Sequence, residues 1–272
     1  MKHHGWTIVP IGGLANRMRV VMSALEIAPK VSYPIRILWQ ATDECKASFQ
    51  ELFEPIEYPN ITFEEGGGWA NKMSTKWNLW IPRLLRKPQY AEQWEDFNPH
   101  GGISADVMQN HTSVFVSTCY PLVDYNESLT KRYFIPTSAL RQEIATSTQA
   151  FGAHTLGVHI RRTDNKMSIL HSPVSAFRQR IDKHLADFPD AQVFLCTDDE
   201  EVKQQFKDIY GQRLLTWDSE LRRNSLKGIQ DAVIELWSLS KTSRVVGSYY
   251  SSFSNTATEI GEQPLEIIQN NL

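Results

Sequence analysis

Residues 157–165 read Gly-Val-His-Ile-Arg-Arg-Thr-Asp-Asn and bring a histidine, two adjacent arginines and a carboxylate into one short stretch. The planar guanidinium of arginine presents a fork of N–H donors that matches phosphate oxygens, so Arg161 and Arg162 indicate a phosphorylated ligand. The alternative is that both arginines face solvent or pair with a nearby aspartate. The stretch alone therefore leaves both interpretations open, and the other motifs of the chain are needed to distinguish them.

A second polar cluster, Thr197, Asp198 and Asp199, ends the apolar run of residues 194–196. Thr197 or Asp198 could simply cap the helix that is expected to begin near Glu200. Adjacent carboxylates can also hold a metal ion, but no further group of acidic residues accompanies this pair in the sequence. We therefore expect no metal site.

Two glycine- or serine-rich turns complete the set of candidate sites. Gly12 and Gly13 lead from an apolar strand into a helix whose first turn carries Asn16 and Arg17, and free N–H groups at a helix start attract anions. Residues 245–255 likewise run from a strand into small hydroxyl residues at a helix start. Serines there suit a phosphate, although they also cap helices without a ligand.

The elements that would position these residues alternate between strand and helix. In the first half we expect strands at 7–11, 35–39 and 114–118 and helices at 14–28 and 137–151. The second half predicts strands at 155–160, 192–196, 213–216 and 244–247, with helices at 173–187, 200–210, 229–240 and from 252 to 261. Such βα alternation predicts an α/β fold with parallel sheets, and ligands bind such sheets at the carboxyl ends of their strands.

The length of 272 residues allows two Rossmann-like domains, and we place their junction near residue 152. Residues 66–102 interrupt the alternation and hold four tryptophans, Trp69, Trp77, Trp80 and Trp94. This insertion is either a packed helical segment or a wall of a sugar-binding cleft. Packing is the commoner cause of such an aromatic cluster.

Composition excludes several classes of protein. The net charge of −3 argues against nucleic acid as a partner. No run approaches the roughly 18 apolar residues of a membrane span, so no integral membrane segment is expected. The chain begins without the apolar core of a signal peptide, and its three scattered cysteines suggest a reducing compartment. We expect a cytoplasmic protein.

Taken in order, these motifs resemble the fucosyltransferase superfamily of eukaryotic α-1,6-fucosyltransferases, the rhizobial nodulation fucosyltransferase and protein O-fucosyltransferases. The resemblance is closest to the α-1,6 group and covers about residues 155–262. It rests on residues 159–164, 194–199, 223–228, the helix carrying Glu235, and Ser251-Ser252. The Gly-Gly-Leu-Ala-Asn-Arg turn that begins at Gly12 is similar to a loop at the start of the family's first domain.

The resemblance implies a GT-B fold, in which two Rossmann-like domains face one another across a cleft. Residues 1–151 would form the acceptor-side domain and residues 152–272 the domain that binds the nucleotide-sugar donor. The implied reaction is an inverting, metal-independent transfer of fucose from GDP-fucose to a glycan, here of bacterial type. No cofactor is implied.

Several site residues follow from the resemblance by position. Arg161 would neutralise the β-phosphate of the leaving GDP, and Arg162 would assist it or position the sugar. His159 and Glu235 would bind the guanosine, Glu235 standing where the family usually has Asp. The remaining residues implied or suggested at the donor site are Ser251, Ser252, Asp198, Asp199, Asn16 and Arg17.

The sequence departs from its relatives on the acceptor side. The α-1,6 enzymes carry a glutamate five residues beyond the motif's aspartate, where this chain has Ile169. An inverting transfer needs a base to activate the acceptor hydroxyl. Asp164 is the nearest carboxylate, although family members use it mainly to shape the site. Either Asp164 or a residue of the N-terminal half serves as the base, or the acceptor chemistry differs, or the protein is inactive. Phe253 also replaces a glutamine that follows the second serine in the α-1,6 group. Alternatives are therefore the same fold using another nucleotide sugar, or a non-catalytic nucleotide- or glycan-binding homologue.

Overall fold

The computed structural model describes residues 4–65, 89–163 and 165–270, and the chain divides into two compact units. The first unit comprises Met1–Thr137 and Arg222–Ile229, and the second comprises Ser138–Leu221 and Gln230–Leu272. The division thus precedes helix α5 (Ser138–Thr148), whereas the junction predicted from the sequence near residue 152 follows it. The assignment of acceptor and donor roles to the two halves stays a prediction.

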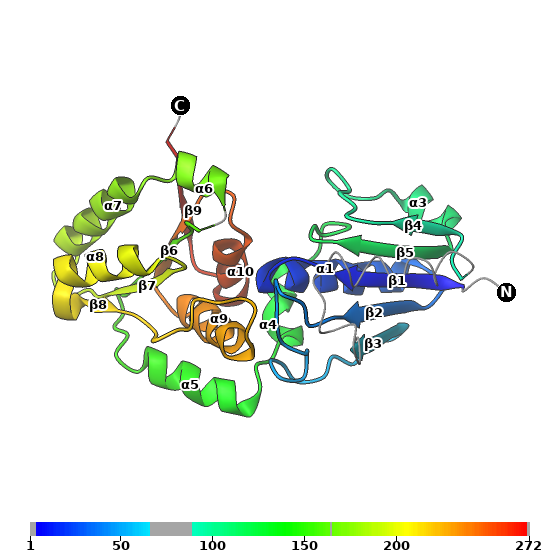
Figure 1. Ribbon diagram of the computed structural model, residues 1–272, viewed down its shortest axis with the longest axis horizontal. Coiled ribbons are helices and arrows are strands. Elements are labelled where there is room, and N and C mark those ends of the chain that lie inside the picture. Colours follow the sequence, from blue (N-terminus) through cyan, green and yellow to red (C-terminus); the bar gives the residue numbers. More distant parts are fainter. Residues whose placement is uncertain (1–3, 66–88, 164, 271–272) are drawn as a thin grey trace. The chain divides into compact units, whose positions relative to one another are not determined.

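A parallel five-stranded sheet organises the first unit (Figure 1), with the strand order β3-β2-β1-β5-β4. The central strand is buried along its whole length and pairs with both β2 and β5. Such strands, covered on both faces, read as continuous apolar runs, which is why the sequence reveals them. The strands are β1 (Gly5–Pro10), β2 (Ile35–Trp39), β3 (Ile61–Glu65), β4 (Glu92–Trp94) and β5 (Ser113–Thr118).

The first connection of this unit runs from β1 through a glycine turn into helix α1 (Leu14–Ile27). Gly12 has φ +80°, a conformation that side chains disfavour, so glycine suits the turn. Met18, Val21 and Leu25 of α1 are buried, as their helical spacing predicts. Further described helices of this unit are η1 (Ala28–Lys30), α3 (Ala105–Asn110), η3 (Glu127–Leu129) and α4 (Thr130–Tyr133).

The tryptophan-rich insertion is described only in its last part. Trp94 lies in β4 and packs edge-on against Trp6, with ring centroids 5.3 Å apart, and against Phe97 at 5.2 Å. This part of the insertion therefore packs onto the sheet. Trp69, Trp77 and Trp80 lie outside the described residues.

A second parallel five-stranded sheet, with the order β10-β9-β6-β7-β8, organises the second unit. Its buried core includes Val158, Ile160, Phe177, Leu195 and Phe206. The strands are β6 (Leu156–Ile160), β7 (Val193–Thr197), β8 (Leu214–Leu215), β9 (Arg244–Ser248) and β10 (Leu265–Ile268). The helices besides α5 are α6 (Lys166–His171), α7 (Val174–Asp187), α8 (Glu200–Tyr210), η4 (Gly211–Arg213), α9 (Leu226–Leu239), which begins in the segment shared with the first unit, and α10 (Ser252–Gly261).

The strand order of the second sheet reverses direction at β6. From β6 the chain passes to β7 and β8 on one side, then returns to β9 and β10 on the other. Open α/β sheets bind ligands outside the carboxyl ends of the strands at such a switch point. The switch point and the arginine motif therefore coincide at the end of β6.

Among the described helices, none is both long and apolar enough to span a bilayer.

Candidate functional site

Asp198 is the centre of the polar cluster at the ends of β6 and β7. Its Oδ2 lies 2.6 Å from Nη1 of Arg161. Its Oδ1 accepts the backbone N–H of Arg162 at 2.7 Å, and its Oδ2 accepts the N–H and the hydroxyl of Thr163 at 3.2 and 2.6 Å. A carboxylate with this many donors is fixed in place, so it holds both the backbone of the loop after β6 and the guanidinium of Arg161.

The backbone of Arg161 is also held from the other side, by strand β9. Its N–H donates to the hydroxyl of Ser248 at 2.9 Å, and that hydroxyl donates to the carbonyl of His159 at 3.3 Å. The side chains of Arg161 and Asp198 are only 15% and 17% exposed, a setting in which charge interactions exceed those at a fully solvated surface. The result is a cation in a defined orientation at the switch point.

His159 points into the unit near the end of β6 and is 6% exposed. Its Nδ1 lies 2.9 Å from the hydroxyl of Ser254, and its ring packs on Phe253 with centroids 4.8 Å apart. Burial, together with the nearby charge of Arg161, lowers the pKa of His159 to about 4. The imidazole is therefore neutral near pH 7, and its hydrogen bond to Ser254 orients the ring.

Glu235 lies in α9, where its Oε1 accepts a hydrogen bond from Ser219 at 3.0 Å. Desolvation raises the pKa of Glu235 to about 7, although the Ser219 hydrogen bond and Lys203 oppose the shift. Cys196, in register with His159 on the neighbouring strand, places its Sγ 3.9 Å from the carbonyl oxygen of Glu235. The two residues predicted to bind guanosine are thus linked through β7.

The side chain of Arg162 is turned into the unit. It is 9% exposed, and its Nη2 donates to the carbonyl of Ser172 at 2.6 Å while Nη1 lies 3.4 Å from the carbonyl of Ile169. Within the described residues its Nε has no hydrogen-bond partner. The contacts show that Arg162 anchors the segment around α6, and its predicted role in donor binding stays a prediction.

Asp199 caps helix α8. Its Oδ1 accepts the backbone N–H groups of Glu201 and Val202 at 2.9 and 3.1 Å. The sequence suggests a cap at Thr197 or Asp198. The carboxylate of Asp198 instead accepts hydrogen bonds from the loop after β6, and the next residue, Asp199, is the N-cap. Any contact of Asp199 with the donor stays a prediction.

Ser251 and Ser252 stand at the start of α10. Ser251 is the N-cap residue, yet its side chain makes no capping hydrogen bond, and both residues are partly exposed. The backbone N–H groups of this helix end are thus left without a side-chain cap from Ser251. A helix terminus of this kind suits an anion, as predicted from the serines.

In the first unit, Arg17 is fully buried. Its Nε donates to the carbonyl of Gly12 at 2.8 Å, its Nη2 to the hydroxyl of Thr42 at 2.7 Å, and its Nη1 to the carbonyl of Gln40. Its guanidinium also lies 5.3 Å from the ring centroid of Trp39. These contacts tie the glycine turn to the residues after β2, and a donor contact for Arg17 stays a prediction.

Asn16, the other predicted donor residue of this turn, is partly exposed in the first turn of α1. Its amide nitrogen is close to Gly12, where a Cβ atom would lie 3.3 Å from it. Glycine therefore makes room for Asn16, and a donor contact for this residue stays a prediction.

Asp164, the predicted base, lies outside the described residues. Ile169, at the position of the expected glutamate, belongs to α6 and is 46% exposed, with its neighbours Met167 and Leu170 at 42% and 57%. Phe253, which replaces the family's glutamine, packs on His159. The described residues hold no group of three or more His, Cys, Asp or Glu side chains able to bind a metal.

The structure adds Ser248, Ser254 and Thr163 to the predicted residues. All three occur within the motifs that the sequence singles out, but their types alone suggest capping or solvent contact. Their roles depend on hydrogen bonds across β6, β9 and α10, which join residues far apart in the chain. A spacing rule within one motif could not have revealed them.

No known protein family and no curated protein matches the sequence. Among solved structures, NodZ alpha-1,6-fucosyltransferase soaked with GDP-fucose matches 95% of this chain and 93% of its own, with 18% identity and a TM-score of 0.63; NodZ is from Bradyrhizobium. A mutant of Arabidopsis thaliana FUT1 in complex with GDP matches 98% of this chain and 70% of its own, with 12% identity and a TM-score of 0.60. POFUT1 in complex with GDP matches 98% and 99%, with 10% identity and a TM-score of 0.56. The chain therefore has a fucosyltransferase-like GT-B fold.

Proposed function

We propose that this protein is an inverting, metal-independent glycosyltransferase that transfers fucose from GDP-fucose to a glycan acceptor. The observation that carries the proposal is the position of Arg161 where β6, β7 and β9 end: Asp198 pairs with its guanidinium, and Ser248 accepts its backbone N–H. The uncapped start of α10 follows β9 in the same unit. The fold likeness to structures solved with GDP or GDP-fucose supports a nucleotide-sugar ligand.

In the proposed reaction the acceptor hydroxyl oxygen attacks the anomeric carbon of fucose from the face opposite the diphosphate. The bond between that carbon and the β-phosphate oxygen breaks, and its electron pair leaves with GDP. Arg161 stabilises the charge that develops on the diphosphate, and a cation already held in place needs little reorganisation to do so. Attack from the opposite face inverts the configuration at the anomeric carbon.

His159 and Glu235 are proposed to bind the guanine. An ionised carboxylate can accept hydrogen bonds from the N–H groups at N1 and N2 of guanine. The neutral ring of His159 can contact the base without adding charge. Ser251 and Ser252, with the N–H groups of α10, are proposed to contact the diphosphate.

The acceptor hydroxyl must lose a proton as it attacks, and Asp164 is proposed as the base that receives it. The exposed apolar side chain of Ile169 cannot take a proton, although relatives of the α-1,6 group carry a glutamate there.

Calorimetric titration of the full chain with GDP, GDP-fucose and UDP tests the donor proposal. We expect GDP and GDP-fucose to bind at sub-millimolar concentration and UDP to bind more weakly, because uracil lacks the N2 amino group that guanine offers to Glu235. A folded protein that binds neither guanine nucleotide refutes the proposal. Preference for UDP would instead identify another nucleotide sugar as the donor.

A second candidate, a non-catalytic homologue that binds the same donor, is favoured by the single observation of Ile169 at the glutamate position. Both candidates predict GDP binding, so binding does not separate them. Donor hydrolysis, or transfer to a mixture of glycan acceptors, does. Release of fucose or formation of a fucosylated product supports the enzyme, whereas tight donor binding without either supports the homologue.

A further inference from the structure

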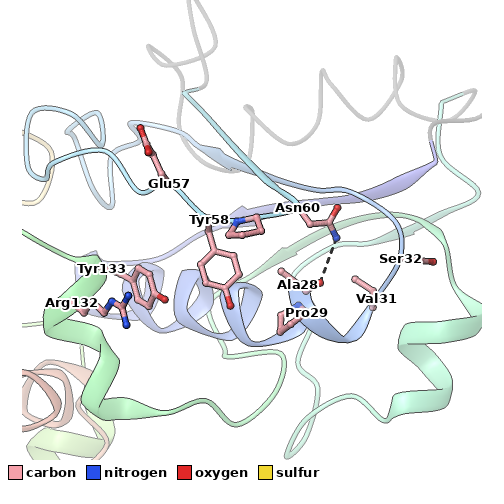
Figure 2. Close-up of a pocket in the computed structure, with 10 residues that line it drawn as sticks. Ala28, Pro29, Val31, Ser32, Glu57, Tyr58, Asn60, Arg132 and Tyr133 are labelled. Atoms are coloured by element: carbon pink, nitrogen blue, oxygen red, sulfur yellow. Dashed lines mark hydrogen bonds between the residues drawn. The ribbon is translucent and has the colours of Figure 1, made fainter.

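A cavity of about 640 Å³ opens on the first unit, and none of the residues predicted to bind the donor lines it (Figure 2). Its volume is within the roughly 300–1,000 Å³ range of small-molecule sites. Three segments far apart in the sequence form its walls: η1 with the residues that follow it, the turn before β3, and the end of α4. The residues that line it include Pro29, Glu57, Tyr58, Asn60, Arg132 and Tyr133.

Two tyrosine rings form the aromatic part of this cavity, which we call the Tyr58–Tyr133 groove. Their centroids are 5.8 Å apart and their planes meet at 67°. Figure 2 shows the ring of Tyr58 between Tyr133 on one side and the Ala28–Pro29 turn on the other. Both rings are only partly buried, so aromatic surface remains accessible to a ligand.

The hydroxyl groups of Tyr58 and Tyr133 form no hydrogen bond with another residue in the described part of the chain. Tyr33, in the same unit, differs because its ring is buried and its hydroxyl donates to the carbonyl of Met108 at 2.7 Å. Desolvation, followed by the neighbouring Tyr133 and Glu26, raises the pKa of Tyr58, so its phenol stays protonated and can donate a hydrogen bond. The two tyrosines thus offer a ligand both aromatic surface and phenol hydroxyl groups.

The turn that carries Tyr58 is held in shape without a ligand. Asn60 has φ +65°, its amide nitrogen donates to the carbonyl of Tyr33 at 2.8 Å and lies 3.4 Å from that of Ala28, and its carbonyl accepts the N–H of Ile35 at 3.0 Å. These bonds join the turn to η1 and β2. A groove fixed in this way loses little conformational entropy on binding.

The charges of the groove restrict the class of ligand. Arg132 and Glu57 are both exposed, and the guanidinium carbon of Arg132 lies 5.7 Å from the ring centroid of Tyr133. One cation and one carboxylate leave no net charge, which disfavours a polyanion. Aromatic faces pack against the C–H faces of sugar rings, while charged and phenolic groups hydrogen-bond to sugar hydroxyls.

We propose that the Tyr58–Tyr133 groove is a binding site for an uncharged oligosaccharide. The inference goes beyond the proposed transfer reaction and does not depend on it, because every lining residue belongs to the first unit and none has a proposed role at the donor.

The test is saturation-transfer NMR and titration of the full chain with trisaccharides of glucose, of mannose and of N-acetylglucosamine. We expect at least one to bind with a dissociation constant below about 10 mM, typical of a weak site of few contacts. Tyr133→Ala removes a stacking ring and should weaken binding by about tenfold or more. Arg132→Ala alters only an exposed side chain, so it should weaken binding without affecting the fold.

Tyr120→Ala is the matched control, because Tyr120 is a 36% exposed tyrosine of the same unit that lies outside the groove, and binding should be unchanged. Loss of binding in this control as well, no binding of any trisaccharide, or binding that Tyr133→Ala and Arg132→Ala both leave intact would overturn the proposal. Binding of a proline-rich peptide alone would overturn it too, since aromatic grooves also accept such peptides. GDP titration of the same samples keeps the two proposals separate: trisaccharide binding without GDP binding refutes only the donor site, and the reverse refutes only the groove.

Discussion

At the scale of single residues, three predicted arginines differ in what their guanidinium groups contact. Arg17 and Arg162 donate to backbone carbonyls inside their units, so both stabilise the local fold. Arg161 is paired with the carboxylate of Asp198 at the ends of the strands. Of the three, Arg161 is the one whose guanidinium lies at the place where a ligand is expected.

Replacing Arg161 tests its proposed role directly. Arg161→Lys keeps the positive charge but loses the planar fork of donors, and we expect transfer to fall by roughly 10²–10³-fold, the size of effect seen when one donor to a developing oxyanion is removed. The fold should persist, because the side chain lies at the ends of the strands and outside the apolar core of the unit. The measurement is the rate of fucose transfer or donor hydrolysis at saturating donor.

Arg178→Lys provides the control, since Arg178 is an exposed helix arginine whose Nε lies 3.9 Å from Asp182. Its activity should match that of the unchanged protein. Full activity in Arg161→Lys and Arg161→Ala would exclude the proposed role.

Glu235 predicts a pH dependence for donor binding. Its pKa of about 7 lies above the ordinary glutamate range, so the acid is increasingly protonated as pH falls below 7 and can no longer accept two guanine N–H groups. The dissociation constant for GDP-fucose should therefore rise by roughly tenfold from pH 8 to pH 6, following the loss of the ionised form. His159, with a pKa of about 4, stays neutral throughout this range.

GDP-fucose is the better ligand for this titration, because the terminal phosphate of free GDP has its own pKa near 6. Glu235→Gln removes the ionisable group, and it should bind the donor weakly with no change between pH 6 and pH 8. A flat profile in the unchanged protein would mean that Glu235 does not read the base.

At the scale of elements, strand β9 and helix α10 are packed unusually close. A Cβ atom on Gly247 would lie 2.4 Å from the hydroxyl oxygen and 2.6 Å from the Cβ of Ser254. Ser254 in turn holds His159 through its hydroxyl. Glycine at this position in the strand therefore sets the location of the α10 N-terminus and, through Ser254, the orientation of a ring predicted to bind the base.

Gly247→Ala should displace α10 from β9. Overpacking of this kind costs about 1–3 kcal/mol, so we expect a lower free energy of unfolding in denaturant together with weaker GDP binding. Gly152→Ala is the matched control, because a Cβ there would meet no atom within 4 Å. If Gly247→Ala lost neither stability nor affinity, the close packing would have no part in shaping the site.

The sequence predicted some elements better than others, for reasons visible in their burial. The predicted ranges 35–39, 200–210 and 252–261 agree with β2, α8 and α10. Strands β3, β4 and β10 were not predicted; each is an edge strand with partly exposed residues, so none shows a continuous apolar run. Helix α6 was also missed, because six residues with an exposed apolar side give no amphipathic period.

At the scale of the whole molecule, a donor that binds only the folded protein must stabilise it. GDP at about 100 times its dissociation constant should add about 2.7 kcal/mol to the free energy of unfolding, and the melting temperature should rise accordingly. Thermal unfolding of the full chain with GDP and with UDP measures the effect. The shift should be smaller with UDP, and smaller with GDP in Arg161→Ala than in the unchanged protein. Equal shifts for both nucleotides would contradict recognition of the guanine.

The order of the motifs along the chain was sufficient to determine the fold class. Buried parallel strands must be apolar throughout, and the polar residues that follow them collect at one edge of the sheet, so the sequence alone predicted an α/β fold with His159, Arg161 and Asp198 near a phosphate-binding site. That fold agrees with the solved structures, while the roles of these residues stay proposals.

Only the tertiary structure decided which groups the polar side chains contact. Arg17 and Arg162 donate to backbone carbonyls, Asp199 caps α8, and Ser248 and Ser254 lie beside Arg161 and His159. The Tyr58–Tyr133 groove had no sequence signal at all, since its two rings are joined by the folding of distant segments. The physical reason is the same in each case: a side chain's type limits the bonds it can form, but its partners come from other strands and helices, which sequence spacing does not specify.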